Sequence, residues 1–180
     1  MAHVMVLVGI AEVFVGIGFA LLASVAVIFT FRHVVKLGDM QEKLKANDAA
    51  SALFHSAGFV ALAIVVRPSI DGAFAAFDLL AQSGGWNWAN VLSFIGYTLL
   101  HISVGLVTGV LVIVVGVWLF DRLTRRVEEL EEVEHGNLSA AILLAGVLFL
   151  VAWLTSPGLS RVLEGLLPWP DIANTIAVGQ

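Results

Sequence analysis

Residues 90–120 read NVLSFIGYTLLHISVGLVTGVLVIVVGVWLF and contain no aspartate, glutamate, lysine or arginine. A helix of about 20 apolar residues crosses a hydrocarbon core of about 30 Å. The apolar side chains follow one another without the alternation that a membrane barrel strand requires. The stretch therefore predicts a membrane-spanning helix that is longer than a bilayer needs.

Three further apolar stretches flank this one, at residues 4–31, 48–66 and 138–154. The chain is 59% hydrophobic and only 13% charged, whereas soluble domains are about 45–50% apolar and about 25% charged. A soluble fold of 180 residues could not bury so much apolar surface. We predict an all-α membrane protein that contacts the lipid bilayer, with four transmembrane helices in one domain, residues 1–180.

The basic residues predict the orientation of these helices. Seven of the nine lysines and arginines lie in two loops, 32–47 and 121–137. Because basic loops stay in the cytoplasm, both charged loops are predicted to be cytoplasmic and both termini outside. This is the pattern of a multi-pass membrane protein.

Helical spacing of apolar residues extends beyond the four spans. It recurs in both charged loops, which predicts cytoplasmic extensions of the first and third helices. It recurs again near residues 69–83, which predicts a short interfacial helix, with a lid packed over the bundle as the alternative. The acidic run Glu128–Glu134 is read as a solvated helix face or as a docking surface for a basic cytoplasmic partner.

A shift of 90 positions aligns the two charged loops without a gap. The paired residues are Arg32 with Arg122, Lys36 with Arg126, Asp39 with Glu129, Glu42 with Glu132, Asn47 with Asn137, Ala50 with Ala140 and Leu53 with Leu143. A run that preserves charge, asparagine and helix boundary together indicates an internal repeat.

The predicted repeats cover about residues 4–66 and 90–154. An outer loop, 67–89, joins them, and an outer tail covers 155–180. Because each repeat contains two helices, the second enters the membrane in the same orientation as the first, and the repeats are parallel. Asn47 and Asn137 are each predicted to cap the membrane helix that follows.

The turn motif also carries a resemblance to a known family. Residues 47-NDAASAL-53 and 137-NLSAAILLAG-146 each lead through Asn-x-x-Ala into a helix of small residues. Two such tandem two-helix units resemble the bacterial membrane family called domain of unknown function 350. The resemblance implies a multi-pass inner-membrane protein and carries no catalytic residue over to this chain. The first copy departs from the second in having His55 and Ser56 where the second has Ala145 and Gly146.

Ionisable residues within a membrane span are costly and need an explanation. Glu12, His55 and His101 lie within three of the spans, and Tyr97 is one turn from His101. Measured from the outer helix ends, all three ionisable residues are expected at similar, near-central depths. Three interpretations remain open: buried hydrogen-bonded contacts, an intramembrane ion or proton path, and a haem b with His55 and His101 as axial ligands.

Small residues predict helix contacts. Gly105 and Gly109 form a GxxxG on the third helix, and Gly9 and Gly16 lie two turns apart on the first. Such residues let helix backbones approach closely in lipid.

No known catalytic motif, no metal-ligand motif and no basic nucleic-acid-binding stripe occurs in the sequence, and there is no cysteine. We predict a non-enzymatic protein that forms homo-oligomers or joins other membrane subunits as an accessory subunit of a larger complex. The alternatives are a small channel or transporter component and a haem-binding redox subunit.

Overall fold

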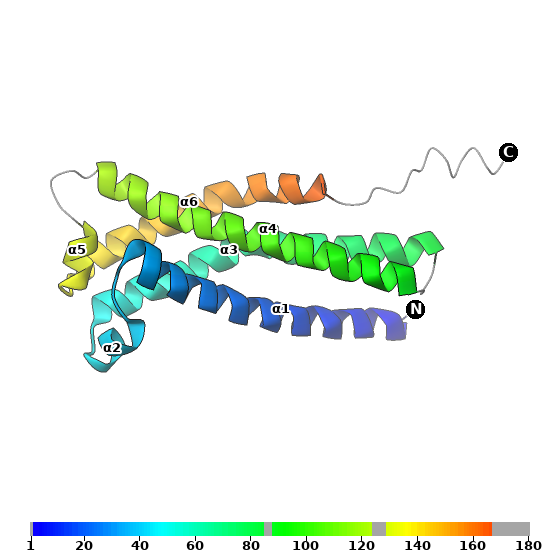
Figure 1. Ribbon diagram of the computed structural model, residues 1–180, viewed down its shortest axis with the longest axis horizontal. Helices are drawn as coiled ribbons and strands as arrows, with labels where there is room; N and C mark the ends of the chain where they lie inside the picture. The colour runs from blue at the N-terminus through cyan, green and yellow to red at the C-terminus, as the bar shows by residue number, and fades with distance from the viewer. Residues whose placement is uncertain (1, 85–87, 124–128, 167–180) are drawn as a thin grey trace.

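The computed structural model describes residues 2–84, 88–123 and 129–166. Four long helices form an elongated bundle in which sequential helices run antiparallel (Figure 1). They are α1 (Ala2–Thr30), α3 (Ala49–Gly84), α4 (Trp88–Leu123) and α6 (Leu138–Glu164). Each is long and apolar enough to cross a membrane, and the described residues contain no strand. The predicted all-α fold with four transmembrane helices is confirmed.

Two short helices, α2 (Met40–Lys45) and α5 (Glu129–Glu134), lie together at one end of the bundle (Figure 1). We call this the loop end, and the opposite end, where α3 leads toward α4, the hairpin end. α3 lies at the centre and packs against α1, α4 and α6. In the most apolar stretch of α3, 56% is buried inside the bundle, whereas in that of α1 only 17% is buried. α1 is therefore a peripheral helix with most of its surface open to lipid.

The α1–α3 contact is made near the loop end by aromatic rings. Phe31 stacks on Phe54 with a centroid separation of 5.0 Å. The Phe31 ring also covers Gly58, where a Cβ would leave it no room. Phe31 and Phe54 are fully buried, so this stacked pair fixes the register of α1 on the bundle.

The expected outer loop and separate interfacial helix near 69–83 are corrected by the structure, because α3 continues to Gly84. Pro68 lies inside α3 and has no N–H to donate to the carbonyl of Ile64. The Ser156 hydroxyl of α6 donates to that carbonyl instead, at 3.1 Å. Because a neighbouring helix satisfies the freed carbonyl, the proline need not end the helix. α6 likewise continues to Glu164, beyond the predicted span.

The expected continuous extension of the first helix is also corrected. α1 ends at Thr30 and passes into a π-helical turn, Phe31–Val35. The chain then turns sharply, because Lys36 is left-handed and Gly38 has a φ of 84°. Asp39 accepts a hydrogen bond from the Gln41 N–H and so caps α2. In the second charged loop the corresponding helix is α5, and residues 124–128 lie outside the described part of the chain.

Candidate functional site

The polar residues of α4 meet α3 along one face. Thr98, His101 and Gly105 share that face because they are three and four positions apart. The His101 side chain is fully buried. Its Nδ1 lies 2.7 Å from the Tyr97 carbonyl oxygen, and since a carbonyl can only accept, Nδ1 is the donor. In a neutral imidazole Nε2 is then an acceptor, and it has no hydrogen-bond partner in the structure.

Two polar side chains of this contact, His101 and Ser69, each face a glycine on the other helix. A Cβ at Gly72 would lie 2.7 Å from Cδ2 of His101. A Cβ at Gly105 would overlap the Ser69 hydroxyl. The two glycines therefore provide the room that the imidazole and the hydroxyl occupy, and the arrangement depends on the sequence of both helices.

The hydroxyls of Ser69 and Thr98 are buried without a hydrogen-bond partner. Several other helical hydroxyls donate to the carbonyl four residues earlier: those of Ser24, Thr30, Ser56, Ser103 and Thr155. We call Ser69, Thr98 and His101, with the facing Gly72 and Gly105, the polar seam. It combines two unused hydroxyl donors with one unused nitrogen acceptor.

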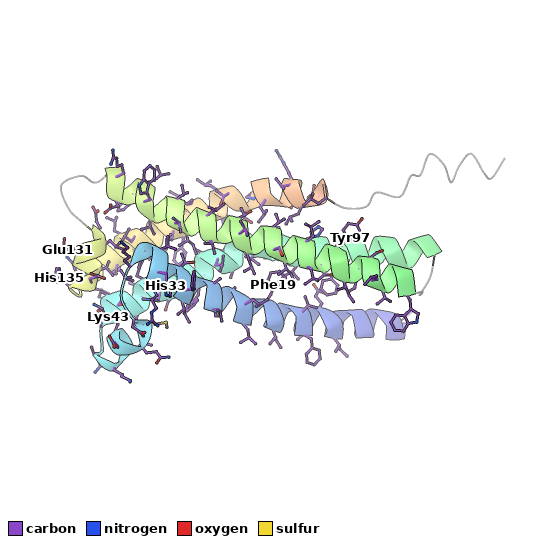
Figure 2. All side chains as sticks on the ribbon, in the orientation of Figure 1. Phe19, His33, Lys43, Tyr97, Glu131 and His135 are labelled. Carbon is purple, nitrogen blue, oxygen red and sulfur yellow. The ribbon has the colours of Figure 1, made fainter. Side chains whose placement is uncertain are left out.

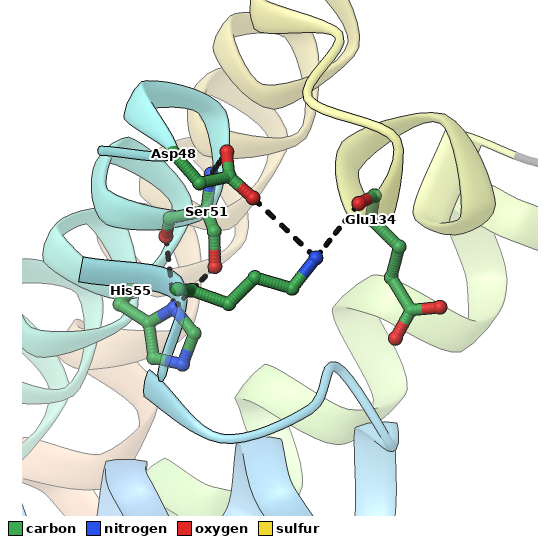
Figure 3. Close-up of polar contacts among 5 residues, drawn as sticks. Asp48, Ser51, His55 and Glu134 are labelled. Atoms are coloured by element: carbon green, nitrogen blue, oxygen red, sulfur yellow. Dashed lines mark hydrogen bonds and ion pairs between the residues drawn. The ribbon is translucent and has the colours of Figure 1, made fainter. Parts of the chain in front are cut away.

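A second polar cluster, drawn in Figure 3 with Asp48, Ser51, His55 and Glu134, lies at the loop end around Lys43. The Lys43 Nζ donates to the Glu134 carbonyl at 2.7 Å and lies 3.4 Å from Oδ2 of Asp48. The other carboxylate oxygen of Asp48 accepts from the Ser51 N–H. Lys43 thus joins the first charged loop to the second.

His55 belongs to this loop-end cluster. It is buried, its Nδ1 lies 2.8 Å from the Ser51 carbonyl oxygen, and its ring meets Phe31 edge-on at 5.1 Å. The imidazole therefore fills a place in the α1–α3 contact.

The two turns that precede α3 and α6 have the same backbone hydrogen bonds at a spacing of 89 residues. The Asp48 N–H bonds to the Lys43 carbonyl, and the Asn137 N–H bonds to the Glu132 carbonyl. Asn137 caps α6 as expected, accepting from the N–H groups of Ser139 and Ala140.

In the first turn the expected cap is corrected, because Asp48 and not Asn47 caps α3. Asn47 is left-handed, with a φ of 55°, and corresponds to Gly136, with a φ of 84°. Asparagine tolerates this conformation better than most residues, so it serves as the turn and leaves the cap to its neighbour. Ala50 and Ala140 are both buried behind these turns.

Residues 94–173 match the sequence model of a family described as Domain of Unknown Function (DUF350). The matched region lies in the second half of the chain, from within α4 through α6. The predicted resemblance is thus confirmed, over a region that includes His101 and Asn137. No curated protein and no solved structure matches the chain.

The structure does not bring His55 and His101 together. His101 contacts Gly72, which is 17 residues beyond His55 on α3 and hence roughly 25 Å away along a helix rising 1.5 Å per residue. Two axial ligands must reach one iron, so this separation does not fit a haem b held by His55 and His101 of one chain. No group of three His, Cys, Asp or Glu side chains that could hold a metal ion occurs among the described residues.

Glu12 lies on the exposed surface of α1. Gly9 and Gly16, on the same face, have no atom within 4 Å of where a Cβ would stand. By contrast, a Cβ at Gly105 or Gly109 would overlap Ser69 or Leu62 of α3. The glycines of α4 are therefore in close helix contacts within the chain, and those of α1 are uncovered.

Tyr97 also differs from its expected place. It lies toward the hairpin end of α4 (Figure 2), and its backbone carbonyl, not its hydroxyl, is the group that contacts His101.

The depths of the ionisable residues are best measured from the loop end. Glu12 is about 20 residues from Arg32, and His101 is about 20 residues from Arg122, so each lies roughly 30 Å from the charged loops. Arg67 is about as far from Asp48. All three are therefore at similar distances from the loop end. His55, seven residues beyond Asp48, lies only roughly 10 Å from it, so the expected common depth of Glu12, His55 and His101 is wrong. The sequence analysis did not identify Ser69 and Thr98 of the polar seam. The available signal was that each lies on the same helix face as a glycine, Gly72 on α3 and Gly105 on α4.

Proposed function

We propose that this chain is a non-enzymatic, multi-pass protein of the bacterial inner membrane that associates with a second copy of itself through α1. The observation that carries the proposal is the Glu12 carboxyl group, which is exposed on a membrane-spanning helix. An acidic side chain facing lipid costs a few kcal/mol on insertion scales, so a partner helix that covers Glu12 stabilises the protein.

The surroundings of Glu12 suit a helix partner. Gly9 and Gly16 lie about one turn away on either side and leave the backbone open to close approach. Only 17% of the most apolar window of α1 is buried, and Glu12 itself is exposed, so its surroundings are open in the single chain.

Arg67 provides the complementary charge. It is exposed on α3, has no ion pair with any described residue, and lies at about the depth of Glu12. Asp71, one turn further along α3, is also exposed and competes for Arg67 within the chain. We propose reciprocal pairing of Glu12 with Arg67 of the second copy in a twofold dimer, the commonest symmetry of homo-oligomers.

We further propose that the chain arose by duplication into two parallel repeats with both charged loops in the cytoplasm. Every buried residue of α6 has a buried counterpart 90 residues earlier in α3, for example Ala140 with Ala50 and Leu144 with Phe54. The turns, by contrast, correspond at 89 residues. The buried faces of α3 and α6 therefore correspond at a spacing of 90 residues, and the turns before them at a spacing of 89.

An acidic docking surface at Glu128–Glu134 has less support. Glu128 lies outside the described residues, and Glu129 is buried. Glu132 accepts a hydrogen bond from the Asn137 side chain. Glu131 and Glu134 remain exposed, and two separated carboxylates offer a basic partner a smaller surface than the continuous run would. An ion or proton path through Glu12, His55 and His101 together also has less support, because His55 is roughly 25 Å from the seam.

Cysteine cross-linking in native membranes tests the dimer, since the chain has no cysteine of its own. We expect oxidation to give a disulfide-linked homodimer with Gly9→Cys or Gly16→Cys. Leu21→Cys is the matched control, because it is exposed on the opposite side of α1. Equal cross-linking at Leu21, or none at the glycines, would contradict the proposal. Cross-links from the glycines to a different protein would favour an accessory subunit of a larger complex.

A further inference from the structure

The polar seam contains three buried polar atoms without a partner: the hydroxyl oxygens of Ser69 and Thr98 and Nε2 of His101. Buried polar groups in native proteins are nearly always hydrogen-bonded, to protein or to ordered water. Three unsatisfied atoms lie along one contact between two facing helices, and each needs a partner that the helices do not supply.

The chemistry of these atoms defines that partner. A hydroxyl can donate one hydrogen bond, and Ser69 and Thr98 do not use theirs on a helix carbonyl. Nε2 of His101 can only accept while the ring is neutral, because Nδ1 holds its hydrogen toward the Tyr97 carbonyl. A ligand must therefore accept from the hydroxyls and donate to the nitrogen. Water both donates and accepts, and it therefore meets both requirements.

The two facing glycines limit the size of the ligand. Gly72 lies against the His101 ring and Gly105 lies against Ser69, so the helices approach closely along the seam. Buried water binds where two to four polar groups converge in little space. We propose that Ser69, Thr98 and His101 form a site for ordered water between α3 and α4, with Nε2 of His101 as the acceptor.

This site is independent of the proposed dimer, because its three side chains are buried within one chain. The site also explains why His101 is buried, and this explanation involves neither a haem nor an ion path shared with His55. The water occupies the part of the seam roughly 30 Å from the loop end, where it supplies the hydrogen bonds that the two helices cannot supply to each other.

The sign of a stability change tests whether the seam holds water. If the seam is dry, removing an unsatisfied hydroxyl relieves a buried polar group, and Ser69→Ala and Thr98→Val raise the Tm of the full chain in lipid nanodiscs. If water is bound, both variants remove one of its ligands, and we expect each to lower the Tm by a few degrees. Ser103→Ala is the matched control, because the Ser103 hydroxyl is exposed and donates to the Leu99 carbonyl.

Direct detection uses solid-state NMR of the same chain labelled with nitrogen-15 in histidine. We expect magnetisation transfer from water to the His101 ring in the parent chain, and a reduced transfer in Ser69→Ala. The His55 ring, whose Nδ1 meets the Ser51 carbonyl, is the internal reference. A parent chain without water transfer to His101 would overturn the proposal, whatever the Tm values are. A higher Tm in both variants would overturn it as well.

Discussion

The loop end and the hairpin end of the bundle differ in whether their polar groups have hydrogen-bond or ion-pair partners within the chain. At the loop end Lys43, Asp48 and Asn137 each have partners within the chain. Toward the hairpin end Ser69 and His101 are buried with unused polar atoms, and Glu12 is exposed in a membrane span. The difference teaches that the polar groups of the loop end find their partners within one chain. Those of the hairpin end do not, and the proposed water and the proposed dimer would satisfy them.

The largest expected effect comes from filling the seam. Gly105→Val places a side chain against Ser69, and overpacking of this kind costs about 1–3 kcal/mol or more. Gly146→Val is the control, because nothing lies within 4 Å of a Cβ there. Thermal unfolding of both variants in detergent should give a clearly lower Tm only for Gly105→Val. Equal Tm values would show that α3 and α4 do not approach closely at the seam.

Breaking the loop end should have the next largest effect. Lys43→Met removes a hydrogen bond to Glu134 and an ion pair with Asp48, whose side chain is only 11% exposed. Hydrogen bonds to charged groups contribute about 1.5–3 kcal/mol, so we expect a loss near the lower value, since Lys43 is partly exposed. Lys45→Met, at an exposed position of the same helix, should change the free energy of unfolding little. If both variants lose the same stability, the loop end is not held by Lys43.

The proline in α3 gives a smaller effect with a specific rescue. Ser156→Ala leaves the Ile64 carbonyl without its donor and should cost about 1 kcal/mol. Pro68→Ala restores the backbone N–H that can donate to the same carbonyl. In a double-mutant cycle measured by unfolding, Ser156→Ala should therefore cost much less in the Pro68→Ala background. Additive losses would show that the serine does not compensate for the proline.

The smallest effect is expected at the turns. Asn47 and Gly136 have positive φ values, so Asn47→Gly should change the free energy of unfolding by less than about 1 kcal/mol. Gly136→Val should cost more than Asn47→Gly, because a β-branched residue is strained in this conformation. The comparison is made by thermal unfolding of the two variants. A large loss in Asn47→Gly would indicate that the asparagine side chain, and not its backbone conformation, holds the first turn.

The sequence was sufficient for the four spans because uninterrupted apolar runs leave few alternatives to membrane helices. It was not sufficient for residues 67–84, because Arg67 and Pro68 look like a helix end. The continuation of α3 depends on Ser156, whose hydroxyl reaches Ile64 from a distant part of the chain. Local spacing cannot reveal such a contact.

The candidate site was predictable in part. His101 was identifiable as an ionisable residue within a span. The residues that surround His101 were not predictable. The contacts of His101 with Gly72 and of Ser69 with Gly105 depend on the register of two antiparallel helices. Distances counted from the predicted helix ends also placed His55 and His101 at one depth, whereas they lie roughly 25 Å apart along α3.

A charge swap at the hairpin end tests the central claim of self-association most directly. The single variants Glu12→Arg and Arg67→Glu place like charges opposite each other, and we expect native mass spectrometry from lipid nanodiscs to find monomers. The double variant restores opposite charges and should return the dimer. A dimer fraction that neither single variant lowers, or that the double variant fails to restore, would contradict the proposed pairing of α1 with a second copy.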